Sequence, residues 1–560
     1  MAATMRWFSR SDVRSFHLLN ATQFLGALND NIFKLLVIYF LINIRGQSAS
    51  SEILALAGAI YVIPFLLFSS GAGVLADRIS KTKIIVGSKT LELVIMLYAV
   101  LAISLHWEFG SYLALFLMAT QSAIFGPSKY GIIPELVESK MISKANSSLT
   151  SLTYLAIILG TFLASFLTDI TNKNFILVAW VCVIIALLGL ATSFGIKKTE
   201  PQRSQKEINP FFFYEIYQTV RLSWRVPHLL TAMFGSSFFL FIGAYTQLNI
   251  IPFAMQSLSL SEVGGGYLFL VTAIGIAIGA IIAGRISKER VEPGLPVIAG
   301  ILIAIFLFIL YLFSFSLTAT ILSLIFLGIF GGCFLIPFDS FIQTHSPNQT
   351  RGQVIAAANF FSFFGVLIAA FVIYLFGERW QLQAATGFAL MGFLTLITDL
   401  FLFGRLSSYF LPFLAEKILP RYGSLQIASP FPPTSSILFI QSDSWFPVLL
   451  LFGSIPKLKI LLPDRFRFPW FNGWFNSFVL LPEDPELLKK KMKDLLIKGE
   501  TLALFFHKEK DNLELLKSYE EIFKDLQLRL SPSTLSEERP KRRFLFFRFR
   551  KKEITIAFPK

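Results

Sequence analysis

The first long apolar run of the sequence holds an unusual number of polar side chains. Between residues 17 and 44 five of them fall within twelve positions: Gln23, Asn29, Asp30, Asn31 and Lys34. Polar and ionisable groups are costly inside a membrane span, so they are candidates for a binding site. Asp30 and Lys34 are four positions apart, on one face of a helix, and could form an ion pair. The alternative is that this face lines a cavity for a charged or zwitterionic substrate, or for a coupling cation.

Polar side chains recur in later apolar runs. Lys129 follows Gly126 and Pro127, which we expect to break the helix of the fourth run and free backbone groups beside a cavity. Lys129 could hold a phosphate group or be a surface lysine, and Glu135 could neutralise it. Glu92 stands isolated in the third run. The further candidates for substrate binding are Gln247 and Asn249 in the seventh run and Asp339 and Gln343 in the tenth.

The composition indicates an integral membrane protein. Of the 560 residues 54% are hydrophobic and 15% are charged, whereas a soluble protein carries roughly 25% charged residues. About twelve runs reach the roughly 20 apolar residues that cross a bilayer, six between residues 17 and 196 and six between 229 and 404. Cys182 and Cys333 fall in apolar runs and give no disulfide or metal signal. We expect no cofactor and no metal.

Charge and composition divide the chain into segments. The net charge of +15 does not indicate nucleic acid, because basic residues of membrane proteins gather in cytoplasmic loops. Their distribution predicts a multi-pass protein with both termini in the cytoplasm. We predict six-helix bundles at 15–196 and 229–405, a cytoplasmic linker at 197–228, a small cytoplasmic domain at 420–535 and a basic-aromatic tail at 536–560. The tail suits an anionic membrane surface or is a solubilising extension.

The loop after the second apolar run carries Gly73, Asp77 and Arg78. Gly73 would let two helices approach closely. Asp77 could lie near a helix N-terminus and pair with a basic residue of the other half, as a latch on one conformation. The alternative is an ordinary basic loop on the cytoplasmic side. In the corresponding loop of the second half the acidic position is Gly284, which predicts a weakened or absent latch there.

This loop resembles the loop between the second and third helices of major facilitator superfamily transporters. Several longer segments resemble the lysophospholipid transporter branch of that superfamily: 23–34 (QFLGALNDNIFK), 121–136 (QSAIFGPSKYGIIPEL), 142–146 (ISKAN), 265–271 (GGYLFLV) and 351–361 (RGQVIAAANFF). The resemblance covers about residues 15–405. It implies an all-α, twelve-helix major facilitator fold in a 6+6 arrangement. It also implies inward flipping of lysophospholipids, such as lyso-phosphatidylethanolamine, across the bacterial inner membrane by alternating access.

The resemblance further implies how the substrate is held. The polar face around Asp30 and the lysine of the fourth helix, Lys129, are expected to handle the headgroup. The acyl chain is expected to use a lateral apolar cleft, which the apolar composition allows.

The C-terminal segment resembles a degenerate glycerolipid acyltransferase, a fusion partner of some relatives, and this resemblance implies a small α/β domain. Residues 438–451 resemble the block with the His-x4-Asp motif, but Ser442 and Pro447 take the places of the His and the Asp. Catalysis needs a His base, held by the Asp, to deprotonate a glycerol hydroxyl. The acyltransferases carry a Phe-Pro-Glu-Gly block further downstream, and in the corresponding segment of this chain Phe505 is the one residue that matches it. We expect no acyltransferase activity, with a rearranged site using Asp443 or His507 as the alternative.

Three functions therefore stand beside one another. The first is a lysophospholipid transporter, with membrane lipids and a separate acyltransferase or acyl-carrier-protein ligase as partners. The second is a transporter of the same fold for a soluble solute or drug, with Asp30 as a proton carrier. The third is a bifunctional transporter and acylglycerophospholipid acyltransferase.

Overall fold

The computed structural model describes two parts of the chain. The first comprises residues 10–46, 49–202, 204, 211–260, 262–287 and 290–418. The second comprises residues 423–427, 437–441, 452, 458–462, 478–480, 487, 490, 492, 494–495, 501–506, 530–537 and 552–557. Within these residues, 12 helices are long and apolar enough to cross a membrane. The twelve spans predicted from hydropathy are thereby confirmed.

Six of the long helices belong to the first half of the chain: α1 (Arg10–Arg45), α2 (Ser50–Arg78), α3 (Lys81–Ser104), α4 (Glu108–Gly131), α6 (Ile142–Ile170) and α7 (Phe175–Phe194). A short helix α5 (Ile133–Leu136) and a 3-10 turn η3 (Ser139–Met141) connect α4 to α6. Helix α8 (Phe212–Ser223) lies in the predicted linker.

The other six belong to the second half: α9 (Leu229–Leu258), α10 (Glu262–Ser287), α11 (Leu295–Leu312), α12 (Leu317–His345), α13 (Arg351–Tyr374) and α14 (Ala384–Phe413). A 3-10 turn η4 (Asn348–Thr350) precedes α13, and π-helical turns η5 (Leu375–Arg379) and η6 (Leu414–Ile418) follow α13 and α14.

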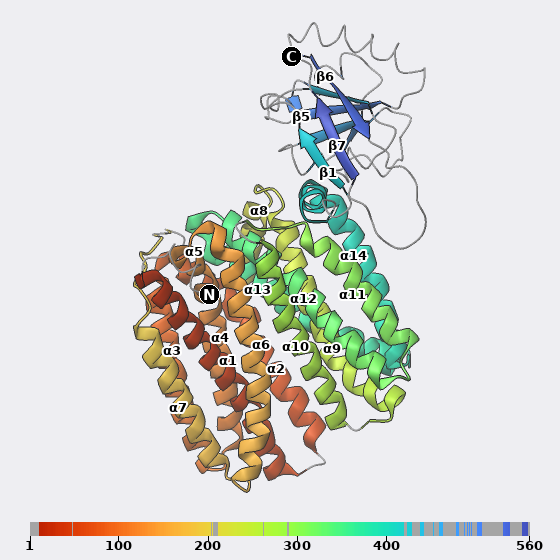
Figure 1. The fold of residues 1–560 in the computed structure, drawn as a ribbon. Coiled ribbons are helices and arrows are strands. Elements are labelled where there is room, and N and C mark those ends of the chain that lie inside the picture. Colours follow the sequence, from red (N-terminus) through yellow and green to blue (C-terminus); the bar gives the residue numbers. More distant parts are fainter. Residues whose placement is uncertain are drawn as a thin grey trace. The chain divides into compact units, whose positions relative to one another are not determined.

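Helix α1 forms the centre of the first half, where it packs against α6 and α7 (Figure 1). Its residues Ile32, Phe33 and Leu36 are fully buried, because neighbouring helices surround this stretch. The outer helix α7 instead exposes large apolar side chains, among them Ile184 and Leu187. Apolar side chains on the outside of a long apolar helix are what a lipid environment requires.

The two halves contact each other mainly through two pairs of helices. Helix α2 packs against α13, and α6 packs against α10. Helix α2 is the second span of the first half, and α13 is the fifth span of the second half. Helix α6 is the fifth span of the first half, and α10 is the second span of the second half. We call the end of the spans where α2 ends and α13 begins the Asp77 end. Helices α6 and α13 begin at this end, and α2, α10 and α12 end there.

Helices α10 and α12 approach each other unusually closely. Gly275 and Gly279 of α10 face Gly328 and Gly332 of α12, and each pair has the spacing of a small-xxx-small motif. A Cβ atom on Gly328 would overlap the carbonyl oxygen of Thr272. Small residues let two backbones meet without intervening side chains, which favours tight association of membrane helices.

Helix α4 corrects one prediction. It continues through Pro127 to Gly131, so the predicted break at Gly126 and Pro127 is wrong. Proline removes the N–H that would bond to the carbonyl of Ala123, but the remainder of the helix is a single turn. Membrane helices tolerate proline because neighbouring groups satisfy the freed carbonyl. Lys129 therefore belongs to a helix and not to a surface loop.

The second part of the chain contains seven strands: β1 (Gly423–Ile427), β2 (Ile437–Gln441), β3 (Leu458–Leu462), β4 (Phe478–Leu480), β5 (Thr501–Phe506), β6 (Leu530–Glu537) and β7 (Lys552–Ala557). They form one sheet in the order β1-β7-β6-β2-β5-β3-β4. All pairs are parallel except β6 with β7.

Parallel pairs need crossover connections, and most of the residues of those connections lie outside the described ranges. The α/β architecture therefore stays a prediction. Strand β7 lies within the segment 536–560, for which the sequence predicts a tail and no strand. Ser442, Asp443, Pro447 and His507 lie outside the described residues.

Candidate substrate-binding cavity

A polar cavity of about 330 Å³ lies where the two halves meet. Helices α1, α3, α4 and α6 supply most of its charged and hydrogen-bonding groups, which include Gln23, Asp30, Asn31, Lys89, Gln121, Ser122, Lys129, Tyr130, Thr150, Thr153 and Tyr154. The second half contributes Leu240, Leu335, Asn359 and Phe363. The chemistry of the cavity is therefore concentrated in the first half of the chain.

Asp30 places its carboxylate at this cavity. Ser122 of α4 donates a hydrogen bond of 2.8 Å from its Oγ to Asp30 Oδ2. Lys34, one turn further along α1, turns away, and its ammonium group lies 4.8 Å from the ring centroid of Tyr61. The possible ion pair between Asp30 and Lys34 is therefore not formed. The carboxylate meets a neutral donor and faces the cavity.

Lys129 brings a positive charge to the same cavity. Its ammonium group donates to Gln23 Oε1 at 3.2 Å and lies 4.9 Å from the ring centroid of Tyr130. Gln23 is held by α6, because its Nε2 donates to Thr153 Oγ1 at 2.5 Å. The suggested neutralisation by Glu135 is wrong, since Glu135 accepts a 2.6 Å bond from Lys81 instead. Lys129, like Asp30, meets a neutral partner at the cavity wall.

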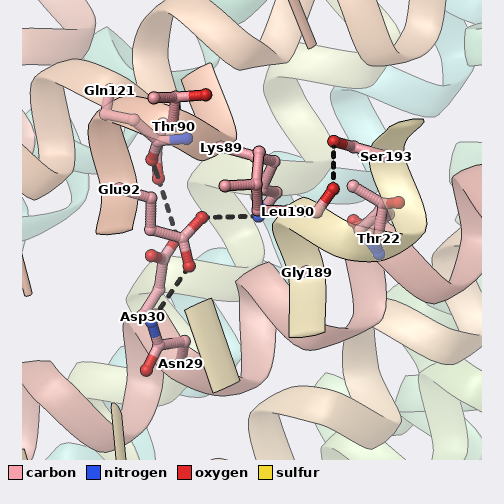
Figure 2. Close-up of polar contacts among 12 residues, drawn as sticks. Thr22, Asn29, Asp30, Lys89, Thr90, Glu92, Gln121, Gly189, Leu190 and Ser193 are labelled. Atoms are coloured by element: carbon pink, nitrogen blue, oxygen red, sulfur yellow. Dashed lines mark hydrogen bonds and ion pairs between the residues drawn. The ribbon is translucent and has the colours of Figure 1, made fainter. Parts of the chain in front are cut away.

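A buried ion pair lies beside Asp30 and corrects the view of Glu92 as isolated. Lys89 Nζ lies 2.6 Å from Glu92 Oε2, and Asn29 Nδ2 donates to Glu92 Oε1 at 2.9 Å. Figure 2 shows the Glu92 carboxylate between these two groups. Lys89 and Glu92 are each 1% exposed. Two partners on one carboxylate offset the cost of burying both charges, so Asp30 and Lys129 remain as the cavity's opposite charges.

Lys89 also lines the cavity and is not among the site residues predicted from the sequence. The signal was available, because Lys89 and Glu92 are three positions apart within one apolar run and so share a helix face. Its side chain extends past two glycines, Gly26 of α1 and Gly189 of α7, and a Cβ atom on Gly26 would occupy the place of the ammonium group. Glycine at position 26 therefore makes room for the lysine.

A second cavity of about 340 Å³ adjoins the first. Its wall is mainly apolar and comes largely from the second half, including Phe238, Phe269, Leu327 and Phe334. Six residues line both cavities: Asn31, Tyr61, Tyr154, Ile157, Leu240 and Phe363. Lys34 and Gln247 belong to the wall of the apolar cavity. A charged space and an apolar space of similar size therefore share a boundary.

Other predicted site residues make contacts between helices. Asn249 donates to the carbonyl of Ala384 at 2.8 Å. Asp339 accepts a 2.8 Å bond from Ser236. Gln343 forms a reciprocal amide pair with Asn146 of α6, with distances of 2.9 and 3.1 Å. Asn249 and Gln343 are absent from the linings of the two cavities, and both are buried.

Asp77 joins α2 to the N-terminus of α13, where its partners are backbone and amide N–H groups and not the predicted basic residue. Its carboxylate accepts bonds from the backbone N–H groups of Gly352 at 2.7 Å and Gln353 at 3.0 Å, and from Gln353 Nε2 at 3.2 Å. The side chain is 0% exposed. The first N–H groups of a helix have no partner within it and attract negative charge. Gly73 lies against the same turn of α13, while Arg78 is exposed.

The other pair of helices is joined at the same end without an acid. Ser147 of α6 donates to the carbonyl of Ala280 at 2.6 Å, and Ser151 donates to that of Ala277 at 3.0 Å. Gly284 packs against Ser147, where a Cβ atom would not fit. The weak latch predicted at Gly284 is thus accompanied by close packing and hydroxyl bonds. With the pair of Asn146 and Gln343, these contacts close the Asp77 end.

The fold consists of two six-helix halves with a cavity between them, and hydrogen bonds from each half to the other close one end. This arrangement defines a membrane transporter of the alternating-access type. The family model described as Major Facilitator Superfamily matches residues 19–370 and 233–456. The first match alone spans more than half of the chain, and the chain belongs to this superfamily.

Curated relatives narrow the comparison. The lysophospholipid transporter LplT of Photorhabdus laumondii subsp. laumondii is 25% identical over 348 residues, which cover 62% of this chain and 83% of the relative. The lysophospholipid transporter LplT of Enterobacter sp. is 26% identical over 347 residues, with coverage of 61% and 83%.

Solved structures agree in fold. The human organic anion transporter MFSD10 (TETRAN) superposes with a TM-score of 0.60 and 13% identity, covering 70% of this chain and 100% of that one. A bacterial homologue of the iron transporter ferroportin in an outward-facing state gives a TM-score of 0.56 at 14% identity, with coverage of 71% and 100%. At these identities the likeness concerns the fold alone.

Proposed function

We propose that this chain moves lysophospholipids inward across the bacterial inner membrane by alternating access. The observation that carries the proposal is the shared boundary between the charged cavity and the apolar cavity. A lysophospholipid has one charged headgroup and one acyl chain, and the two spaces match these two parts. The likeness to lysophospholipid transporters supports the same substrate class.

The charges suit a zwitterionic headgroup. Lysine is a frequent phosphate ligand, so Lys129 takes the phosphate, while Asp30 takes the ammonium group of lyso-phosphatidylethanolamine. Glu92 already offsets Lys89, which therefore adds no unbalanced charge to the headgroup site. The acyl chain enters the space between Phe238, Phe269 and Phe334. Burial of each methylene there is worth about 0.8 kcal/mol.

Orientation follows from charge. Basic residues cluster at the Asp77 end, for instance Arg78 and Lys83, and such residues mark the cytoplasmic side. Both termini of the transporter part then lie in the cytoplasm. In this orientation the conformation described above is closed toward the cytoplasm. Inward transport requires the bonds of Asp77, Ser147 and Asn146 to open.

The test is uptake of labelled lyso-phosphatidylethanolamine into spheroplasts that lack their own lysophospholipid transporter. Hydrogen bonds to charged groups contribute about 1.5–3 kcal/mol, so Asp30→Asn should lower uptake at least about tenfold. Asp169→Asn, which changes an exposed acid, is the matched control and should leave uptake unchanged. Normal uptake by Asp30→Asn would remove Asp30 from the site. Absence of uptake by the inserted parent protein would favour a soluble solute or drug.

We further propose that the C-terminal part has no acyltransferase activity. Strand β2 ends at Gln441, immediately before Ser442, and it pairs in parallel with β5 so that Gln441 lies opposite Phe506. The two segments that resemble acyltransferase blocks thus begin in neighbouring strands, which supports the resemblance. Ser442 and Pro447 cannot act as a base and its orienting acid. Reacylation of the imported lipid then requires a separate acyltransferase or acyl-carrier-protein ligase.

The full chain, incubated with a lysophospholipid and an acyl donor, should form no diacyl product. Product formation that disappears in an Asp443→Ala, His507→Ala variant would overturn this proposal and establish a rearranged site. Product formation that persists in that variant points to a contaminating enzyme, which mass spectrometry of the preparation would identify.

A further inference from the structure

We propose that α8 is an interfacial helix that binds anionic phospholipid headgroups in the leaflet at the Asp77 end. Its aromatic face enters the bilayer surface, and Arg221 and Arg225 contact the lipid phosphates. The proposal does not depend on which substrate the transporter carries.

The burial pattern of α8 is largely the reverse of that of a helix on a water-soluble protein. Its buried residues are Glu215, Ile216, Thr219 and Ser223, three of them polar. Its exposed face carries aromatic side chains, with Tyr217 61% exposed and the following Trp224 76% exposed. Surface helices in water turn their apolar stripe inward. The reversed arrangement is stable where the exposed face meets a partly apolar medium, as at the edge of a bilayer.

The types of exposed residue fit the lipid headgroup region. Phe213, Tyr214 and Tyr217 project from neighbouring positions of one face, as helical spacing requires, and all are exposed. Tyrosine and tryptophan are enriched at membrane interfaces because their rings are apolar and their tips polar. Arg221 lies on the same face by helical spacing, Arg225 follows the end of the helix, and both are exposed. Guanidinium groups bind phosphate through paired hydrogen bonds.

The position of α8 agrees with this assignment. The rings of Phe212 and Phe213 lie 6.1 and 6.3 Å from that of Phe360 of α13. Phe360 is nine residues into α13, roughly 14 Å from its first residue at 1.5 Å per residue. The start of α8 thus contacts the bundle alongside a membrane span and not beyond its end. Anionic lipid is concentrated in the cytoplasmic leaflet, where the basic residues place this end of the protein.

Helix α8 also contacts both helices that Asp77 joins, α2 and α13. Ser204, upstream of α8, is bonded to the same region, because its N–H donates to the backbone carbonyl of Asp77 at 3.3 Å. Lipid bound to α8 therefore stabilises the conformation in which the Asp77 end is closed.

The test places a fluorescent bimane label on Tyr217→Cys in the full chain, reconstituted into nanodiscs of phosphatidylethanolamine. Both native cysteines are buried, so the introduced thiol reacts selectively. Quenching by phosphatidylglycerol with a nitroxide on its acyl chain is compared with quenching by phosphatidylcholine labelled in the same way. Each arginine near an anionic surface enriches anionic lipid roughly fivefold, so we expect much stronger quenching by phosphatidylglycerol.

Arg221→Gln with Arg225→Gln should remove the preference for phosphatidylglycerol while quenching by both lipids persists. Lys83→Gln with Lys198→Gln removes two exposed charges at the same end and should keep the preference. Equal quenching by the two lipids in the parent protein would overturn the proposal. Quenching of the label by iodide in water but by neither lipid would also overturn it, because water would then cover this face. Absence of quenching by every reagent would do the same, because protein would then cover this face.

Discussion

Replacing Asp77 with asparagine should open the end of the transporter that this residue closes. The substitution keeps the size of the side chain but removes its charge and one of its two acceptor oxygens. In the structure those oxygens serve three donors at the N-terminus of α13, two of them backbone N–H groups. Asparagine can satisfy at most part of this set, and its own amide would face another N–H group.

The size of the effect follows from these contacts. A charge-assisted hydrogen bond is worth about 1.5–3 kcal/mol, and a buried donor left unsatisfied costs a similar amount. The charge at the helix N-terminus adds up to about 2 kcal/mol when it is buried. Because the three contributions overlap, we expect a net loss of about 3 kcal/mol, a factor of roughly 100 in the equilibrium. A protein closed at a ratio of about 99:1 would become nearly evenly distributed.

The assay is a spin-label distance between Ile79→Cys and Gln349→Cys, both at exposed positions beside the contact. Asp77→Asn should move much of the distance distribution to longer values. Gly73→Ala should act in the same direction without a change of charge, since its Cβ atom would lie 2.5 Å from that of Ala356. An unchanged distribution in Asp77→Asn, or an equal change in the control Asp169→Asn, would refute the reasoning.

Three further expectations concern packing and buried polar pairs. Lys89→Met alone should lower the stability of the detergent-solubilised protein by about 3–5 kcal/mol, because it leaves a buried carboxylate unpaired. Adding Glu92→Gln should restore part of the lost stability. Strictly additive losses in thermal unfolding would contradict the ion pair. Gly328→Ala should cost about 1–3 kcal/mol by forcing α10 and α12 apart, and an unchanged unfolding temperature would count against that close approach. Asn146→Ala, Gln343→Ala and the double variant should all open the Asp77 end to nearly the same extent. The spin-label distance between positions 79 and 349 can establish this.

Composition and run length were sufficient to predict the helices that cross the membrane, since about 20 apolar residues suffice for each. They were not sufficient for the contacts between them. Asp77 meets residues 275 and 276 positions away, and no local pattern specifies that partner. Glu135 was assigned to a nearby lysine, yet a lysine 54 positions away holds it. Pro127 was read as a helix break because the sequence alone does not reveal that the helix ends one turn later.

The candidate site was partly accessible to the same reasoning. Asp30 and Lys129 could be selected because ionisable groups are rare in spans. Lys89 is recognisable only together with Glu92, one helical turn away, because the pair shares a helix face and neutralises its own charge. The apolar cavity has no signal of its own in a chain that is 54% hydrophobic. Its shape depends on how helices of the second half pack, which side-chain types alone do not fix.

The two cavities draw their walls from different halves of the polypeptide, and this has a consequence for how such a protein can diversify. The ionic groups are encoded before the linker and most of the apolar wall after it. A crossover within residues 197–228 would exchange one set and retain the other. Chimeras between related transporters made at that point would inherit charge selectivity from the first parent and the shape of the apolar space from the second. Substitutions of residues that line only one cavity can accordingly accumulate while the wall of the other stays unchanged.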